Sequence, residues 1–277
     1  MPSFIYKGQK PSEIGADVET NAGDIGTLQT DVGNKAEAID VQTFTGNGTW
    51  TKPSSGTVAQ IRLWGAGGDG SVGSGSSRGG GGGGGGFAEF WLLMSDLSAS
   101  ESVTVGTGGA PGGYSEFISG SSIRAYGGGA GSVTGTSTDG ASGGGGGTIS
   151  AGSNASGATP GAGGEPSEVS AGWSSSQYRG GAAGVAAFSH GNSSVFGGGG
   201  GGSGGNGDGG NSIWGGGGGG GGLSGSAGTS VYGGNGGAGG DPGAAGTAPG
   251  GGGGGGAGDP SPGGDGADGR VEVYVYD

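Results

Sequence analysis

Residues 194–234 read SVFGGGGGGSGGNGDGGNSIWGGGGGGGGLSGSAGTSVYGG, and this stretch contains the same kind of five-residue motif three times. The motif begins at Ser194, Ser212 and Ser230, so successive copies lie 18 residues apart. Each copy places a serine, a β-branched residue and an aromatic ring before a run of glycine, and a decayed fourth copy stands at residues 248–251. Because self-similarity at a fixed spacing is typical of stacked repeats, the stretch predicts a layered, repetitive domain.

Glycine dominates the whole chain, with 90 of its 277 residues. Collagen would require glycine at every third position and abundant proline. Here there are only 10 prolines, and the glycines come in blocks such as Gly79–Gly86. A flexible linker is the usual alternative for Gly/Ser-rich sequence. A linker, however, gives no reason for Phe196, Trp214 and Tyr232 to stand at the same position of each repeat.

Long glycine runs favour the polyglycine-II form, an extended left-handed helix with three residues per turn. Glycine disfavours α-helix because it loses the most backbone entropy, and it weakens strands because it has no side chain to pack. The extended form points its N–H and C=O groups outward, so bare neighbouring runs can satisfy one another. We expect residues 130–269 to form a bundle of such helices, in which each repeat runs out, turns and runs back. A glycine-rich β-structure is the alternative.

Residues 41–129 predict short strands separated by glycine. Val58–Trp64 alternates in the way expected of a strand with one better-buried face. Residues 270–277 alternate valine with charged and aromatic residues, and we expect this last strand to pair with the early strands and close the domain. The other predicted strands are a strand-turn-strand unit at Phe44–Trp50, and Phe87–Leu93, Ser102–Val105, Tyr114–Ile118 and Ile123–Tyr126.

The N-terminal residues have a heptad pattern instead. Six apolar residues take its core positions: Ile14, Val18, Ile25, Leu28, Val32 and Ile39. This spacing predicts a coiled-coil stalk over residues 14–40, after an anchor segment at 1–13. Its interior glycines each cost about 1 kcal/mol relative to alanine, so the helix needs partner strands, and we favour a homotrimer. The alternative is a loosely structured anchor.

The predicted fold class is therefore a short N-terminal coiled-coil-like helix followed by a mainly β and polyglycine-II head over residues 41–277. The head would contain little regular secondary structure, because strands are confined to 41–129 and 270–277.

Charge and composition exclude several functions. The formal net charge of −13 disfavours a nucleic-acid partner, which would call for a basic patch. There is no cysteine for a thiolate metal site, and no stretch of sequence is long and apolar enough for membrane insertion. We expect no cofactor and no enzymatic activity, since His190 is the only histidine and lacks the surroundings of a catalytic triad. The carboxylates that could hydrolyse a glycan or hold a loose calcium ion lie in turn-like contexts: Glu165, Glu168, Asp259, Asp265 and Asp268.

Residues 148–195 form the longest departure from glycine in the repetitive part of the chain. They contain Trp173, Tyr178, Phe188 and His190 among small polar residues. Aromatic rings that provide contact area and small polar residues that adapt are typical of recognition surfaces. These four residues are therefore the candidate receptor-binding set; the alternative is that Trp173 and Phe188 pack onto the glycine runs.

Five motifs follow one another between Thr43 and Asp277: Phe44-Thr-Gly-Asn-Gly-Thr-Trp-Thr-Lys-Pro53, Ile61-Arg-Leu-Trp-Gly-Ala-Gly-Gly68, Gly79–Gly86 before Phe87-Ala-Glu89, Ser102-Val-Thr-Val-Gly-Thr-Gly-Gly109 and Gly269-Arg-Val-Glu-Val-Tyr-Val275. Their order resembles the glycine-rich domain of bacteriophage tail-fibre proteins, and the glycine blocks resemble polyglycine-II tail-fibre adhesins. The resemblance implies a virion protein, made in the host cytoplasm, that joins other tail or fibre proteins and binds a bacterial surface protein or polysaccharide through variable tips. A fibre or head-decoration protein without a receptor is the alternative, and a glycan-degrading tail enzyme is a third.

Overall fold

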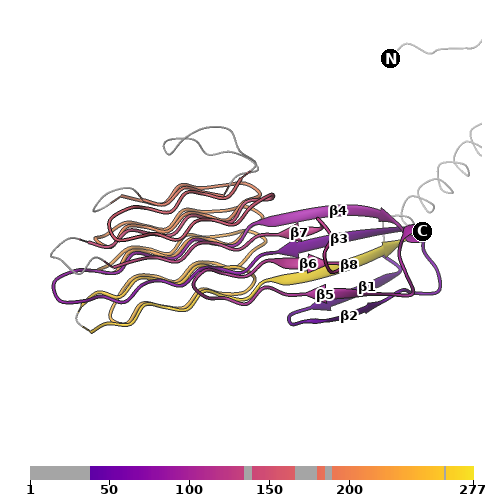
Figure 1. Cartoon of the computed structure of the whole chain (residues 1–277), viewed down its shortest axis with the longest axis horizontal. Helices are drawn as coiled ribbons and strands as arrows, with labels where there is room; N and C mark the ends of the chain where they lie inside the picture. Colours follow the sequence, from indigo (N-terminus) through magenta and orange to yellow (C-terminus); the bar gives the residue numbers. More distant parts are fainter. Residues whose placement is uncertain (1–37, 134–138, 166–179, 185–188, 259) are drawn as a thin grey trace, which may run out of the picture.

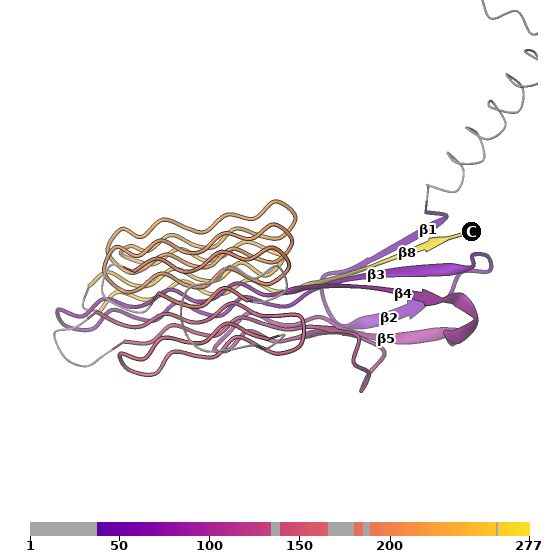
Figure 2. The ribbon, with the colours of Figure 1, turned by 90° about the horizontal axis from the view of Figure 1, so that it is seen from above.

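The computed structural model describes residues 38–133, 139–165, 180–184, 189–258 and 260–277. These residues form two parts placed end to end: a β-sandwich, and a slab of extended glycine-rich runs (Figures 1 and 2). The C-terminus lies at the end of the sandwich that points away from the slab (Figure 2), and Asp40, near the start of the described chain, pairs with Val275 beside it. The described residues form no helix long and apolar enough to cross a bilayer.

The sandwich consists of two antiparallel four-stranded sheets. Sheet A has the strand order β1-β8-β3-β4, and sheet B has the order β2-β5-β6-β7. The strands of sheet A are β1 (Asp40–Phe44), β8 (Arg270–Tyr276), β3 (Val58–Trp64) and β4 (Phe87–Leu93). The strands of sheet B are β2 (Gly48–Thr51), β5 (Ser100–Thr104), β6 (Ser115–Phe117) and β7 (Arg124–Ala125), and a 3-10 turn, η1 (Met94–Asp96), follows β4.

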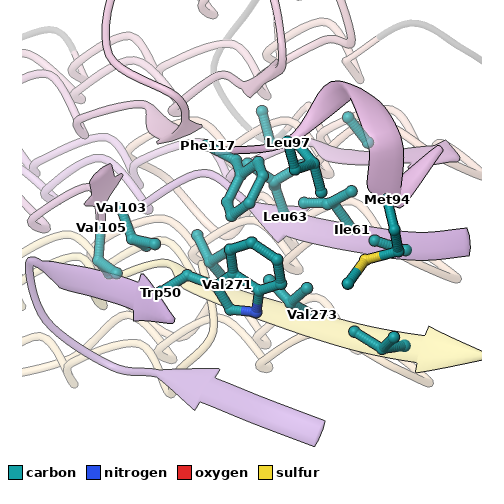
Figure 3. Packing of buried hydrophobic residues seen from close by; sticks show 14 residues of the cluster. Trp50, Ile61, Leu63, Met94, Leu97, Val103, Val105, Phe117, Val271 and Val273 are labelled. Carbon is teal, nitrogen blue, oxygen red and sulfur yellow. The ribbon is translucent and has the colours of Figure 1, made fainter. Parts of the chain in front are cut away.

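Alternating side chains explain where the core lies. In β8 the three valines Val271, Val273 and Val275 are fully buried, whereas the residues between them face outward. β3 contributes Ile61 and Leu63 to the same layer. Sheet B supplies the opposing layer, which includes Trp50, Val103 and Phe117, so the apolar core is the space between the two sheets (Figure 3).

One ion pair is built into sheet B. The guanidinium of Arg124 on β7 lies 2.6 Å from the carboxylate of Glu116 on β6, whose side chain is only 4% exposed. The same carboxylate oxygen accepts the backbone N–H of Gly120 at 3.1 Å. The hydrogen bond to Glu116 is the largest cause that raises the pKa of Arg124. The pair therefore satisfies a carboxylate that would otherwise be buried without a cation.

We expect Arg124→Met to lower the free energy of unfolding by about 2 kcal/mol, because the substitution leaves the Glu116 carboxylate buried and unpaired. Adding Glu116→Gln to this variant should recover a large part of the loss. Guanidinium denaturation followed by tryptophan fluorescence measures both. Equal stability of the single and double variants would contradict a role for the buried charge.

The slab is organised around the run Gly79–Gly86, which is buried along its whole length. Its N–H groups bond to three neighbouring runs in turn: Gly79 to Gly256, Gly80 to Ser132, Gly81 to Gly202, and Gly82 to Gly253 again in the first run. Its carbonyls accept N–H groups from three further runs, with Gly68, Gly143 and Gly219 as donors. Each run thus satisfies its backbone laterally with a period of three residues, which is the condition for burying bare backbone.

The predicted fold class is wrong. The described residues contain no α-helix, and their regular structure is the pair of antiparallel sheets, whereas the slab runs are neither helix nor strand. Residues 14–37 of the predicted coiled coil lie outside the described residues. Its last core position, Ile39, instead donates its N–H to the carbonyl of Val275 at 2.7 Å and leads into β1. Pairing with β8 determines the structure at Ile39, where heptad spacing alone cannot distinguish helix from strand.

The strand-turn-strand unit predicted at Phe44–Trp50 is also different in the structure. β1 and β2 do not pair with each other; β1 pairs with β8, and β2 pairs with β5. The turn between β1 and β2 is fixed to sheet B, because the side-chain oxygen of Asn47 accepts the N–H of Val105, which directly follows β5, at 2.9 Å. The connection therefore crosses between the sheets. The predicted closing strand is present as β8 and lies between β1 and β3.

Candidate functional site

The 18-residue repeats stack side by side and in register. Ser194 pairs with Ser212, and Ser212 pairs with Ser230, each as a parallel bridge. The hydroxyl of Ser212 donates to the carbonyl of Gly197 at 2.7 Å, and that of Ser230 donates to Gly215 at 2.6 Å. The hydroxyls of Ser212 and Ser230 thus link their own repeats to the preceding one.

The aromatic residues of the repeats form a stack where the slab meets the sandwich. Trp214 lies parallel to Tyr232, with ring centroids 4.1 Å apart, and to Phe196 at 6.4 Å. It also stacks on Phe87 of β4 at 5.1 Å, and its carbonyl accepts the indole N–H of Trp64 at 2.8 Å. The aromatic position of the repeat therefore joins the slab to sheet A.

The opposite end of the slab consists of a series of turns. Gly79 lies at this distal end, because its run leads at the other end into β4 (Figure 1). The turns that gather there come from chain segments far apart in the sequence, and Gly204 of one repeat donates its N–H to Gly140 beside this end. We call this set the distal loops, and their described residues are 72–78, 132–133, 139, 156–159, 189–190, 204–208, 222–226, 240–243, 257–258 and 260–261.

Polar side chains of the distal loops form rows with the period of the repeat. The N–H of Asp208 donates to Nδ1 of His190 at 3.0 Å, and the N–H of Ser226 donates to Oδ1 of Asp208 at 2.7 Å. In a neighbouring row the hydroxyl of Ser224 donates to Oδ1 of Asn206 at 3.0 Å. His190 and Asp208 remain 64% and 46% exposed. The end of the slab is thus a fixed array of exposed hydrogen-bonding groups.

Of the predicted receptor-binding residues, the structure describes only His190. His190 is in the distal loops, while Trp173, Tyr178 and Phe188 lie outside the described residues. Sequence reasoning missed Asn206 and Asp208; comparing polar residues at the 18-residue spacing would have found them. Of the predicted oligomerisation residues, only Ile39 is described.

Two of the candidate carboxylates, Asp265 and Asp268, lie in the run that leads into β8. Asp268 accepts the N–H of Gly108 at 2.8 Å, so it fastens a loop. Glu165 lies at the end of another run, and Asp259 and Glu168 lie outside the described residues. Within the part of the chain that the structure describes, no three His, Cys, Asp or Glu side chains gather as metal ligands.

Residues 42–276 match the family model described as a glycine-rich domain. The matched range begins in β1 and ends in β8, so it covers the sandwich and the slab together. None of the curated proteins compared with the chain matches it. Since the model spans most of its length, the chain belongs to the glycine-rich domain family.

Proposed function

We propose that the protein is a bacteriophage tail-fibre adhesin that attaches the virion to the surface of its bacterial host. The observation that carries the proposal is the placement of the distal loops at the end of a rigid slab, away from the described chain ends (Figure 2). Loops held by a rigid scaffold are where binding residues concentrate. In this proposal the chain forms a homotrimer and joins other tail or fibre proteins.

The contrast between the buried glycine runs and the distal loops supports a division of the slab into scaffold and binding surface. A Cβ on any residue of Gly79–Gly86 would lie under 3.0 Å from neighbouring backbone, so the interior run accepts only glycine. The distal loops instead carry varied side chains, such as His190, Asn206 and Leu223. Such an arrangement lets recognition residues change without disturbing the scaffold.

The chemistry of the loops indicates the class of receptor. Exposed hydroxyl, amide and carboxylate groups suit hydrogen bonding to a surface protein or a polysaccharide, since small polar residues adapt to such ligands. Arg78 in the distal loops is paired with Asp139 at 3.6 Å. With a net charge of −13, the chain is not suited to a strongly anionic receptor.

The test is the binding of the fluorescently labelled full chain to cells of the host bacterium, measured together with competition against phage adsorption. We expect saturable binding that Leu223→Arg weakens at least tenfold, since Leu223 is 42% exposed in the distal loops. Val231→Arg is the matched control, because Val231 is 69% exposed but lies in a turn at the sandwich end.

Equal binding by both variants would move recognition away from the distal loops. A folded chain that binds no cells would favour a fibre or head-decoration protein without a receptor.

A further inference from the structure

The outer face of sheet A carries aromatic rings among charged side chains. Trp91 on β4 is 56% exposed, and Tyr274 and Tyr276 on β8 are partly exposed on the same face. Arg62 and Glu89 come from β3 and β4, which pair in register at these two residues. This face belongs to the sandwich, so it is separate from the distal loops and independent of the function proposed for them (Figure 1).

Trp91 and Tyr276 form an aromatic pair above β3. Their ring centroids lie 5.7 Å apart, with 29° between the planes. Gln60, which pairs across the sheet with Trp91, is only 4% exposed, and its Oε1 accepts the phenol of Tyr276 at 3.0 Å. The indole N–H of Trp91 donates to Glu89 at 3.1 Å. Hydrogen bonds to neighbouring side chains therefore hold both rings in place before any ligand arrives.

The charged groups beside this pair balance one another. Arg62 forms an ion pair with Glu89 at 3.2 Å and lies over the ring of Tyr274, 5.1 Å from its centroid. Glu272 accepts the phenol of Tyr274 at 2.8 Å and pairs with Arg270 at 3.0 Å. The face is thus locally neutral in a chain whose net charge is −13, and each cation named here has an anionic partner.

We propose that this face binds neutral polysaccharide, with sugar rings stacked on Trp91 and Tyr276. One side of a pyranose ring is a plane of C–H groups that packs on an aromatic ring, while its rim of hydroxyls requires donors and acceptors. Glu89 and the guanidinium of Arg62 provide both beside the rings. Because the side chains are already ordered, binding costs little further rotamer entropy.

The same features disfavour other partners. Glutamate is depleted in the cores of protein interfaces, whereas Glu89 lies beside Trp91 in the middle of this face. A nucleic acid or anionic polysaccharide would need cations that are not already neutralised. A neutral, ring-shaped, hydroxyl-rich ligand satisfies the aromatic surface and the paired charges together.

The test is titration of the full chain with three neutral hexasaccharides, maltohexaose, cellohexaose and chitohexaose, followed by tryptophan fluorescence and calorimetry. We expect saturable binding of at least one sugar, weakened roughly tenfold by Trp91→Ala through the loss of the stacking contact. Tyr276→Phe should have a smaller effect, since it keeps the ring and removes only the hydroxyl. Tyr232→Ala is the matched control, because Tyr232 is 52% exposed but lies in the slab.

Three outcomes would overturn the proposal: no saturable response to any of the three sugars, equal weakening by Trp91→Ala and Tyr232→Ala, or a self-association of the chain that Trp91→Ala abolishes without sugar binding. Circular dichroism of each variant shows whether it is folded. The Leu223→Arg variant should bind sugar normally even if it no longer binds cells, which separates this site from the distal loops.

Discussion

Gly82→Val is expected to prevent the slab from folding, with a loss of roughly 4 kcal/mol or more in the free energy of unfolding. An added Cβ at Gly82 would lie under 3.0 Å from the carbonyl carbon and oxygen of Gly68, and from the carbonyl oxygen of Asp69. These are backbone atoms of a neighbouring run, so no side chain can rotate away to make room. Separating the runs would also break the hydrogen bonds from Gly82 to Gly253 and from Gly219 to Gly82.

Gly258→Val is the matched control, because nothing lies within 4 Å of an added Cβ at that position of the slab. Guanidinium denaturation followed by circular dichroism compares the two variants with the parent chain. We expect the control to stay within about 0.5 kcal/mol of the parent, as surface substitutions usually do. A Gly82→Val variant of parental stability would show that the runs do not pack as closely as the structure places them.

The strands were predictable where side chains alternate. Val58–Trp64 and Phe87–Leu93 are present as β3 and β4 over the predicted residues, because each segment has enough β-branched, aromatic or leucine residues to define a buried face. The pairing of Phe44–Trp50 was not predictable in the same way. Its turn suggests a hairpin, but β1 pairs with β8 in sheet A and β2 pairs with β5 in sheet B.

The arrangement of the glycine runs could not be predicted from their sequence. A run such as Gly79–Gly86 has no side chains that distinguish one neighbour from another, and its neighbours come from residues 65 to 256. The 18-residue repeat does carry such information, since its serines and aromatic rings contact the equivalent residues of the next repeat. Repetition is therefore readable in the sequence, while the packing order of the bare runs is not.

The candidate site was predictable only in part. His190 was selected for its place in a polar segment, and it lies in the distal loops beside Asp208. The connections to the strands determine which end of the slab is distal. Gly86 leads into β4, so the other end of its run is the distal one. Composition cannot show this, because aromatic residues look like binding residues whether they face solvent or, like Trp214, join the slab to the sandwich.

The second large effect is expected at Trp50, the largest fully buried side chain of the sandwich (Figure 3). Its ring meets Phe117 edge to face, with centroids 5.7 Å apart. Trp50→Ala would leave a cavity between the two sheets, and a buried tryptophan replaced by alanine costs about 4 kcal/mol. Trp50→Phe should cost much less, because it keeps a ring and removes an indole N–H that has no hydrogen-bond acceptor among the described residues.

Trp91→Ala is the matched control for this loss, since Trp91 is 56% exposed and should change stability by about 0.5 kcal/mol. Thermal unfolding of the three variants should report the sandwich and the slab in one transition. The reason is covalent as well as energetic: β3 continues into the slab at Gly65, β4 begins directly after Gly86, and β8 directly after Gly269. If Trp50→Ala lowered only the fluorescence transition and left the circular dichroism transition of the glycine runs unchanged, the slab would fold without the sandwich, and the strands would be its attachment rather than its support.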